Sequence, residues 1–477
     1  MLTISGNPRR TCQTVSRRQI LTAGGAGLLG LTLPKVLAAS ESSAFSGGRA
    51  KSVIFLFLFG GPSQFETFDM KPEAPSEIRG PFFPIASRTP GLLISEHLPR
   101  LAQQSDQYCV VRTMSHDYND HSGGGHYIQT GHRWQIPVGG GFSSTPNDWP
   151  SMGSVVEYLA QNRANGHSRD LPSYAVVPNW LGRLQDKGQY RRPGQYPGWL
   201  GLQYSALTTA IDKQSVSDNP YWRDCTDEEL KFEIEGLAPE VPISTIRRRT
   251  SLLEQFDESR RLVDEKGFQA YDRFRERAMA LITSDSTREA LDIRRESPEL
   301  RDRYGRHLFG QSCLMARRLV ESGVRFVTVH YDCVDGYSWD SHRNSDDVKK
   351  HLLPTFDQGC SALLADLSDR GLLDETLVVA LGEMGRTPKG NATWGRNHWS
   401  TLFPALLAGA GVVGGTTYGR SDRLGERPDE GLVTPEDLAA TVYRSLGIDP
   451  QLTLPDALGR PIPIVENGTP LTGLLTV

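Results

Sequence analysis

The sequence has few cysteines, few aromatic residues and no long apolar run in its main part. It contains 6 cysteines in 477 residues, and aromatic side chains make up 8% of it. The cysteines are scattered along the chain, which excludes a dense disulfide framework. No Cys-x-x-Cys pair occurs, so a zinc or redox site built from cysteines is disfavoured. We therefore expect buried thiols. Beyond the N-terminal region no stretch approaches the roughly 20 apolar residues of a spanning helix, so we expect no stable membrane insertion after signal cleavage.

An excess of basic residues is also missing. The chain carries 52 Lys and Arg against 56 Asp and Glu, a formal net charge of −4. Residues 1–39 hold five basic side chains and no acidic one, so the net charge without them is −9. Nucleic-acid binding requires a basic surface that collects phosphates, and we therefore exclude nucleic acid as a partner.

The N-terminal region has the three parts of an export signal. A basic stretch with the pair Arg17-Arg18 precedes a glycine-rich apolar run over 21–33 and small residues at 36–39. This order predicts a twin-arginine signal peptide over 1–39, a tether over 40–50 and a periplasmic or extracellular protein that is exported already folded. The alternative, an uncleaved membrane anchor, is disfavoured because the apolar run is too short.

Continuous apolar runs recur along the rest of the chain. They cover 52–59, 108–112, 325–330 and 376–381, with a further candidate over 402–407. Such runs are typical of strands buried on both faces. Helical patterns lie between them, including one from 361 that ends near Gly371. We therefore predict an α/β fold with a mostly parallel sheet sandwiched by helices.

The middle of the chain has a different character. Residues 180–204 are rich in Gly, Pro, Tyr and Arg, which favours an ordered surface loop or lid. Residues 244–320 are highly charged, with apolar residues at three- and four-residue steps, as in amphipathic helices with a solvated face. We predict one domain over 51–477 with a loop and helical insertion at about 150–320.

Acidic and histidine residues follow the predicted strands, where ligands bind in open α/β sheets. Four of the eleven histidines, His116, His121, His126 and His132, lie close together after the second run. The candidate ligands after the other runs are Glu66, Asp69, Asp340, His342, Glu383 and His398. Imidazole and carboxylate groups together predict a divalent metal, with Zn, Mn, Ca or Mg left open. Asp340-x-His342 alone is equally compatible with a hydrogen-bonded loop pair.

Groups suited to an anion accompany these ligands. The triplet Gly123-Gly124-Gly125 would let backbone amides approach an anion at the start of a helix ending near Gly131, although a flexible loop is the alternative. Arg386 and Arg396 are candidates for binding a phosphate or sulfate in forked geometry.

Several motifs resemble one family of exported bacterial proteins, domain of unknown function 1501. They occupy 60–61, 67–72, 303–305, 316–319, 339–342, 382–388 and 395–399. That family resembles a branch of the alkaline phosphatase–sulfatase superfamily. The resemblance implies an α/β sheet carrying one or two metal ions that hydrolyse phosphate or sulfate esters.

The resemblance also suggests roles for individual residues. Asp340, His342 and His398 match the Asp, His and His ligands of the phosphatases, and Glu383 matches one of a ligand pair whose second member here is Met384. Counting back from Thr130-Gly131 as in the sulfatase signature places His121, and not a nucleophile, at the catalytic position; Ser122 is next to it.

Two functions follow as hypotheses. The first is an extracytoplasmic hydrolase in which Asp340, His342, Glu383 and His398 hold a metal, supported by Glu66 or Asp69 at a second one. Ser122 or a water would attack an anionic ester, either a small molecule or a sulfated polysaccharide. The alternative is a non-catalytic binding or assembly protein that keeps the sulfatase-like fold.

Overall fold

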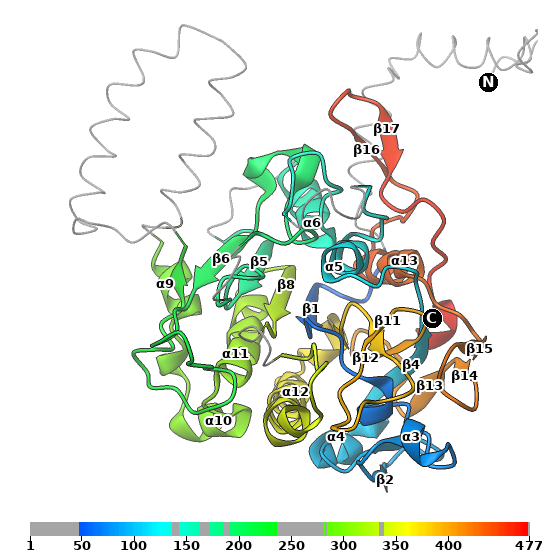
Figure 1. The fold of residues 1–477 in the computed structure, drawn as a ribbon. Helices are drawn as coiled ribbons and strands as arrows, with labels where there is room; N and C mark the ends of the chain where they lie inside the picture. The colour runs from blue at the N-terminus through cyan, green and yellow to red at the C-terminus, as the bar shows by residue number, and fades with distance from the viewer. Residues whose placement is uncertain are drawn as a thin grey trace, which may run out of the picture.

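A computed structural model describes most of the chain after the predicted signal (Figure 1). The described residues are 47–135, 143–162, 171–185, 190–235, 281, 284–332 and 338–475. The predicted signal peptide and nearly all of the tether lie outside them, as does most of the predicted helical stretch between 244 and 283. Within these ranges, no helix combines the length and apolarity needed to cross a bilayer.

A nine-stranded sheet forms the centre of the molecule. In spatial order its strands are β13 (Thr416–Tyr418), β4 (Tyr108–Met114), β12 (Phe403–Ala408), β9 (Thr376–Leu381), β1 (Ser52–Phe57), β8 (Phe326–His330), β5 (Tyr174–Val177), β6 (Leu207–Ala210) and β7 (Glu233–Ile234). Only β12 and β7 run antiparallel to their neighbours among these strands. All five predicted strands are present, and the prediction of a mostly parallel sheet is confirmed.

Strand β1 shows why the apolar runs are continuous. It pairs in parallel with β8 on one side and with β9 on the other, so that Ile54 faces Val327 and Val378. Every residue of the strand is buried. Alternate side chains enter different cores, with Ile54 in one and Phe55 in the other, because successive residues of a strand point to opposite faces.

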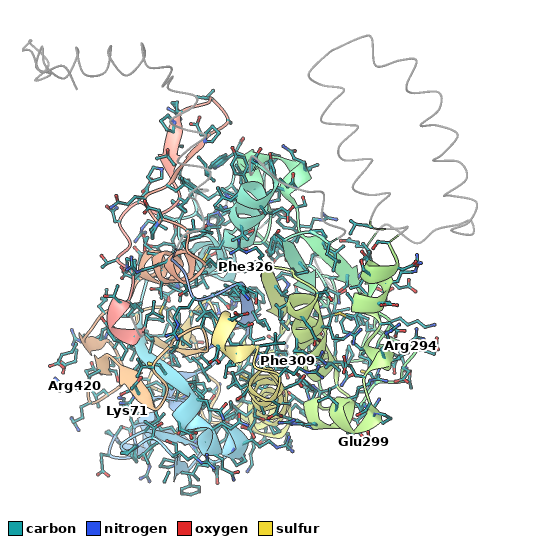
Figure 2. The ribbon with its side chains drawn as sticks, turned by 180° about the vertical axis from the view of Figure 1, so that it is seen from behind. Lys71, Arg294, Glu299, Phe309, Phe326 and Arg420 are labelled. Atoms are coloured by element: carbon teal, nitrogen blue, oxygen red, sulfur yellow. The ribbon has the colours of Figure 1, made fainter. Side chains whose placement is uncertain are left out.

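Helices cover both faces of the sheet. In Figure 1, α11 (Leu308–Glu321) and α12 (Leu353–Asp369) lie below it, and α5 (His121–Thr130), α6 (Met152–Gln161) and α13 (Pro435–Ser445) lie above it. Phe309 of α11 and Phe326 of β8, both labelled in Figure 2, belong to the two separate cores. The predicted sandwich is thus confirmed, and α12 contains the helix expected before Gly371.

Shorter elements complete the described fold. The remaining helices and helical turns are η1 (Gln64–Glu66), α3 (Ser76–Arg79), α4 (Pro99–Gln103), η2 (Ser105–Gln107), η3 (Gly198–Leu200), η4 (Leu202–Tyr204), α9 (Asp285–Leu291), η5 (Ile293–Arg295), α10 (Pro298–Tyr304), η6 (Val348–Leu352), η7 (Leu373–Glu375) and η8 (Thr472–Leu474). The antiparallel pairs are β2 (Pro84–Ala86) with β3 (Leu93–Ser95), β10 (Gly385–Arg386) with β11 (His398–Trp399), β14 (Arg420–Ser421) with β15 (Pro428–Glu430), and β16 (Thr453–Pro455) with β17 (Pro461–Pro463).

The region predicted as an insertion, about 150–320, also builds the main fold. It contributes β5, β6 and β7 to the sheet and α11 to one covering layer. The domain boundaries themselves stay a prediction. The expected buried thiols are confirmed for Cys109, Cys225, Cys313 and Cys360, whereas Cys333 lies outside the described residues.

Candidate metal centre

Chain segments that follow three strands of the sheet meet at one place. His121 opens α5 after β4, Asp340 follows β8, and Glu383 comes two residues after the end of β9. His398 lies on β11, which pairs with β10 just beyond β9. These segments converge because β4, β8 and β9 point in the same direction in the sheet.

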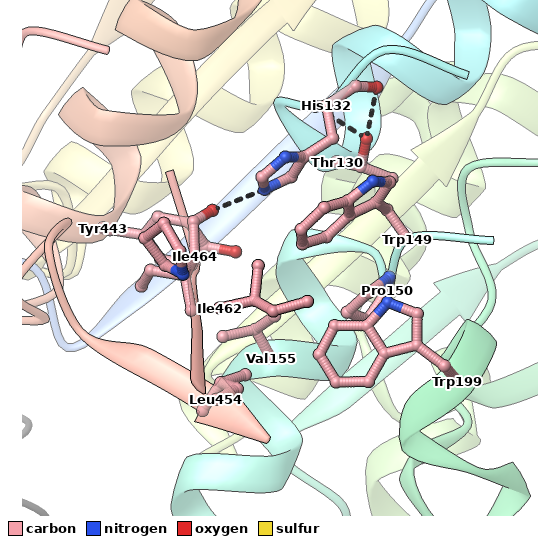
Figure 3. Close-up of a pocket in the computed structure, with 11 residues that line it drawn as sticks. Thr130, His132, Trp149, Pro150, Val155, Trp199, Tyr443, Leu454, Ile462 and Ile464 are labelled. Atoms are coloured by element: carbon pink, nitrogen blue, oxygen red, sulfur yellow. Dashed lines mark hydrogen bonds between the residues drawn. The ribbon is translucent and has the colours of Figure 1, made fainter. Parts of the chain in front are cut away.

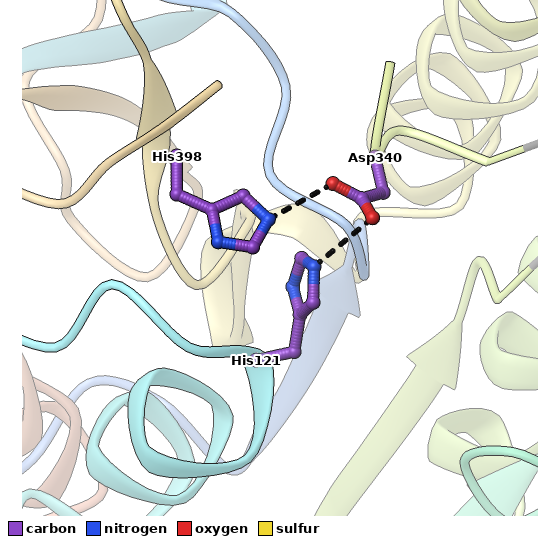
Figure 4. Close-up of side chains that lie close together, drawn as sticks. All are labelled: His121, Asp340 and His398. Atoms are coloured by element: carbon purple, nitrogen blue, oxygen red, sulfur yellow. Dashed lines mark hydrogen bonds and ion pairs between the residues drawn. The ribbon is translucent and has the colours of Figure 1, made fainter. Parts of the chain in front are cut away.

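His121, Asp340 and His398 form the centre of this arrangement (Figure 4). Each offers one ligand atom, and these atoms all lie within 4.8 Å of one another. His121 Nε2 is 3.2 Å from Asp340 Oδ2, and His398 Nε2 is 3.1 Å from Asp340 Oδ1. The two imidazoles therefore face opposite oxygens of one carboxylate.

His342 joins the same cluster from its exposed side. Its Nε2 atom lies 3.0 Å from Asp340 Oδ1 and 2.9 Å from His398 Nε2. Burial lowers the pKa of His342, which favours the neutral ring. Three imidazole Nε2 atoms thus surround one carboxylate, and the predicted grouping of Asp340, His342 and His398 is present.

Each of the three histidines has an oxygen partner for its other ring nitrogen. The pairs are His121 Nδ1 with Glu383 Oε1 at 2.5 Å, His398 Nδ1 with the Asn119 carbonyl at 2.8 Å, and His342 Nδ1 with Asn397 Oδ1 at 3.0 Å. An oxygen acceptor fixes the hydrogen on Nδ1. In the neutral ring the lone pair is then on Nε2, facing Asp340, which is the outer-partner arrangement of histidines that bind metals.

The carboxylates of Asp340 and Glu383 favour a positive charge on or beside the His121 ring. Its buried Nε2 atom makes no hydrogen bond of good geometry, although Asp340 is close. Burial alone would lower the pKa of His121, but the nearby carboxylates of Asp340 and Glu383 outweigh it and raise the pKa to about 9. A proton or a metal ion supplies the required charge.

Asp340 remains a carboxylate in this environment. Burial opposes ionisation, yet His121, His398 and Arg386 together hold its pKa well below the usual range. Arg386 contributes directly, because its Nη2 atom lies 2.6 Å from Asp340 Oδ1.

Glu383 orients His121 and does not reach the centre of the cluster. Its side chain is fully buried, and the Gly60 amide donates to both carboxylate oxygens at 3.0 and 3.1 Å. The prediction that Glu383 binds the metal is therefore revised to a positioning role. Gly60 has φ +113°, and a Cβ atom there would lie 2.5 Å from the Asp340 amide nitrogen, so only glycine fits.

His116 supports Glu383 from the main chain, a role that the sequence did not reveal. Its Nδ1 accepts from the Tyr118 amide, so Nε2 carries the hydrogen that goes to the Glu383 carbonyl at 2.6 Å. Burial lowers the pKa of His116 and keeps it neutral. The only sequence signal was its place in the histidine-rich stretch after β4.

Asp69 and Glu66 lie in separate ion pairs. Asp69 is 2.9 Å from Lys71 Nζ and also bonds to Ser421. Glu66 is fully buried, with Arg396 Nε at 3.7 Å and no hydrogen bond to either carboxylate oxygen. Burial raises the pKa of Glu66 to about 7, although Arg396 and Arg386 oppose it. Neither carboxylate is in the cluster, and their support of a second metal stays a prediction.

Arg386 and Arg396 use their donors within the protein. Arg386 donates to the carbonyls of Gly60, Gly61 and Arg396 as well as to Asp340. Arg396 donates to the carbonyls of Ile78, Thr387 and Pro388. Both are buried, and their predicted role as anion-binding groups is revised to holding the loops around the site.

The glycine triplet and Ser122 are built into α5. Asp120 caps this helix, with its Oδ1 accepting from Gly123 N at 2.7 Å and its carbonyl accepting from Gly124 N at 3.0 Å. The expected helix up to Gly131 is confirmed, and the Gly123 and Gly124 amides are already bonded to Asp120. Ser122 is buried in the first turn of this helix, beside His121.

His126, in α5, and His132, just after the C-terminus of α5, have structural roles. His126 bonds to the His132 carbonyl at 3.0 Å, and His132 bonds to the Ile464 carbonyl at 2.9 Å. His132 also lines a mainly apolar pocket with Trp149 and Trp199 (Figure 3). This pocket lies at the end of α5 opposite His121. Its volume is only ≈ 10 Å³, which is too small for a ligand.

Comparisons with known proteins identify the family and leave the activity open. A family profile described as "Protein of unknown function (DUF1501)" matches residues 50–475, which agrees with the resemblance seen in the sequence. No curated protein matches the chain.

Similar solved structures include a sulfatase, a phosphonate monoester hydrolase and an alkaline phosphatase. A sulfatase from Pseudoalteromonas sp. has 12% identity and a TM-score of 0.41, with 93% of this chain and 75% of the sulfatase covered. A phosphonate monoester hydrolase from Silicibacter pomeroyi has 10% identity and a TM-score of 0.37, with 89% and 76% covered. An alkaline phosphatase from the Antarctic bacterium TAB5 has 11% identity and a TM-score of 0.35, with 84% and 97% covered. Scores this low transfer no activity, so the site has to be judged on its own geometry.

Proposed function

The chain belongs to the DUF1501 family, and we propose that it is a metal-dependent hydrolase of sulfate or phosphate esters. One observation carries this proposal. His121, His342 and His398 direct Nε2 atoms toward the Asp340 carboxylate, while each Nδ1 is bonded to an oxygen acceptor. Nitrogen and oxygen ligands in this ratio suit Zn²⁺ or Mn²⁺ better than Mg²⁺ or Ca²⁺, which prefer oxygen.

The donor set fits a metal because, without a cation, the lone pairs of its nitrogen and oxygen atoms would face one another. The Nε2 atoms of His342 and His398 lie 2.9 Å apart, and both lie close to one carboxylate oxygen. A cation near these atoms would satisfy all of them together. Glu383 bonds to Nδ1 of His121, and Arg386 bonds to Oδ1 of Asp340, so each of these two side chains has a fixed partner.

The protein groups have distinct tasks in the proposed reaction. A divalent metal, when bound, polarises an ester oxygen and lowers the pKa of a bound water. His121, His342, His398 and Asp340 would hold it. Since Ser122 is buried in α5, we propose that a water attacks the ester and that the protein forms no covalent intermediate through this serine.

The cellular location of the protein is proposed from its sequence. The paired Arg17-Arg18 and the apolar run after it support export by the twin-arginine route, and thus work outside the cytoplasm. A chain with Arg17→Lys and Arg18→Lys should stay in the cytoplasm, and unchanged export of that chain would contradict this part of the proposal.

The decisive experiment measures metal first and turnover second. The purified protein is analysed for bound metals, and its thermal unfolding is followed with Zn²⁺, Mn²⁺, Mg²⁺ and Ca²⁺, because a ligand of the folded state raises the unfolding temperature. Aryl sulfates, aryl phosphates and phosphodiesters are then offered to the metal-loaded and the chelated protein. We expect hydrolysis only with metal and recovery when the metal returns.

Two results would contradict the proposal in different ways. A protein that holds no metal and gains no stability from any of the four ions has no metal centre. A protein that binds metal through His398 but hydrolyses none of the three ester classes fits the alternative of a non-catalytic binding protein.

A further inference from the structure

Arg192 is a buried cation between two aromatic rings. Its side chain is 9% exposed, and its guanidinium lies 4.8 Å from the ring centre of Phe59 and 4.7 Å from that of Tyr190. Among the described residues, its one hydrogen bond runs from Nη2 to Gln185 Oε1 at 3.3 Å. The buried Nε atom has no hydrogen-bond partner in this part of the chain.

No carboxylate compensates this charge within the described part of the chain. Arg192 makes none of the ion pairs found there, whereas the buried Arg317, Arg386 and Arg396 each lie beside an acidic side chain. A buried charge without a partner is costly, because its lost hydration is not replaced. Stacking on aromatic rings recovers only part of that cost.

The guanidinium is close to the metal centre. Phe59 is the last residue of the apolar run that contains β1, and its ring centre lies 5.3 Å from that of His121. The guanidinium of Arg192 lies against the same Phe59 ring. The guanidinium is therefore no farther from the His121 ring than the guanidinium–Phe59 and Phe59–His121 distances taken together. A ligand with two anionic groups would have to be long enough to cover that span.

The loop that carries Arg192 is fixed to the fold. Gln195 accepts from the Leu181 amide through Oε1 at 3.3 Å, and its carbonyl accepts from the Tyr174 hydroxyl at 3.3 Å. The loop around Arg192 is therefore fixed, and the Nε atom of Arg192 has no hydrogen-bond partner among the described residues.

We propose that Arg192 binds a second acidic group of the substrate, separate from the ester that is cleaved. The group would be a sulfate, phosphate or carboxylate, since a guanidinium recognises each of them through paired N–H donors. This inference rests on the proposed hydrolase function and narrows its substrates to esters with at least two anionic groups, as in a multiply sulfated saccharide.

The test uses Arg192→Met, which keeps the aliphatic packing and removes the charge. Arg191→Met is the matched control, because that neighbouring arginine is largely exposed and is paired with Glu235. Thermal unfolding is measured with sodium sulfate against sodium chloride of equal ionic strength, for the wild type and both variants, also with His398→Ala added. Sulfate stabilises folded proteins in general, so the general effect should appear in all variants. We expect an additional stabilisation of the wild type and Arg191→Met that Arg192→Met lacks, with or without His398.

Kinetics give the second readout. An aryl sulfate with one anionic group is compared with the same ester bearing an additional sulfonate on the ring. Arg192→Met should raise KM roughly tenfold for the doubly charged ester and leave kcat and the simple ester nearly unchanged, which corresponds to one lost charge-assisted hydrogen bond.

The outcomes separate this inference from the function on which it rests. Equal stabilisation of the wild type and Arg192→Met by sulfate, or equal KM changes for both esters, would overturn the subsite. Sulfate stabilisation that depends on Arg192 in a protein without hydrolase activity would support the subsite and contradict the proposed function.

Discussion

The Nε2 atoms of His342 and His398 lie 2.9 Å apart and both face Oδ1 of Asp340. The Nδ1 hydrogens of these rings are directed to Asn397 and Asn119, so neutral rings would turn two lone pairs toward each other and toward a carboxylate. Electron-rich atoms at such distances repel unless a proton or a metal ion lies among them. Removing one of these ligands should therefore lower the metal affinity of the cluster strongly.

Replacing His398 by alanine should abolish metal retention and hydrolysis. The substitution removes an atom that contacts both Asp340 and His342. We expect metal affinity to fall by more than about 100-fold, the upper range for changes in outer partners of metal ligands. Metal analysis after dialysis and equilibrium titration with Zn²⁺ measure the effect. The control is His351→Ala, a histidine that stacks on Trp222 away from the cluster. Full activity of His398→Ala would remove this residue from the site.

Glu383→Gln should weaken metal binding without abolishing it. The glutamine keeps the shape that receives the Gly60 amide, but it removes the charge that stabilises the Nδ1 hydrogen of His121. Outer partners of this kind contribute about 10–100-fold in metal affinity, and we expect a loss in that range. A loss as large as that of His398→Ala would instead make Glu383 a direct ligand.

Asp69→Asn is the matched control, since it makes the same chemical change at another buried carboxylate. It leaves Lys71 without its ionic partner, so the free energy of unfolding should fall by on the order of 3 kcal/mol. Metal affinity should stay unchanged, because Asp69 does not belong to the cluster. Denaturant unfolding and metal titration of the same sample separate the two effects.

Most of the sheet could be predicted from the sequence because its strands are buried on both faces. The runs that became β1, β4, β8, β9 and β12 are mostly apolar, and this pattern is characteristic of covered parallel sheets. The short strands β5 to β7 gave no such signal, since the longest of them has four residues.

The metal cluster was partly predictable for a topological reason. Polar residues after parallel strands meet at one edge of the sheet, which brought Asp340, His342 and His398 together and added His121. The direction of a side chain was not predictable. Whether Glu383 faces the cluster or the Gly60 amide, and whether Arg396 faces a ligand or the carbonyl of Ile78, depends on loops more than 300 residues away in sequence.

Gly60→Ala should disturb the metal centre through the main chain. The new Cβ would lie 2.5 Å from the amide nitrogen of Asp340, and the φ of +113° disfavours any residue with a side chain. The Asp340 backbone must then move, so we expect weaker metal binding together with about 1–3 kcal/mol lower stability. Gly459→Ala is a suitable control, because its φ is +77° and a Cβ there meets no atom within 4 Å. Equal effects of both substitutions on metal titration would mean that contact with Asp340 is unimportant.

Glu66 should make the stability of the protein depend on pH below neutrality. Burial raises its pKa to about 7 in the folded state, despite the charges of Arg396 and Arg386, against an ordinary value of 4.5. The folded state therefore binds this proton more tightly than the unfolded state. The resulting stabilisation is complete below about pH 4.5 and is lost as the pH rises to about 7.

Glu66→Gln replaces the titrating group with a neutral one of nearly the same shape and should remove this dependence. The measurement is the free energy of unfolding of the wild type minus that of the variant, at steps from pH 4 to pH 8 at constant ionic strength. We expect this difference to fall between about pH 4.5 and 7 and to level off above it, since an ionised Glu66 remains buried without a hydrogen bond. Glu77→Gln, at an exposed position nearby, corrects for the loss of one acidic group. A difference that rises with pH would show that Arg396, 3.7 Å away, keeps Glu66 ionised in the folded protein.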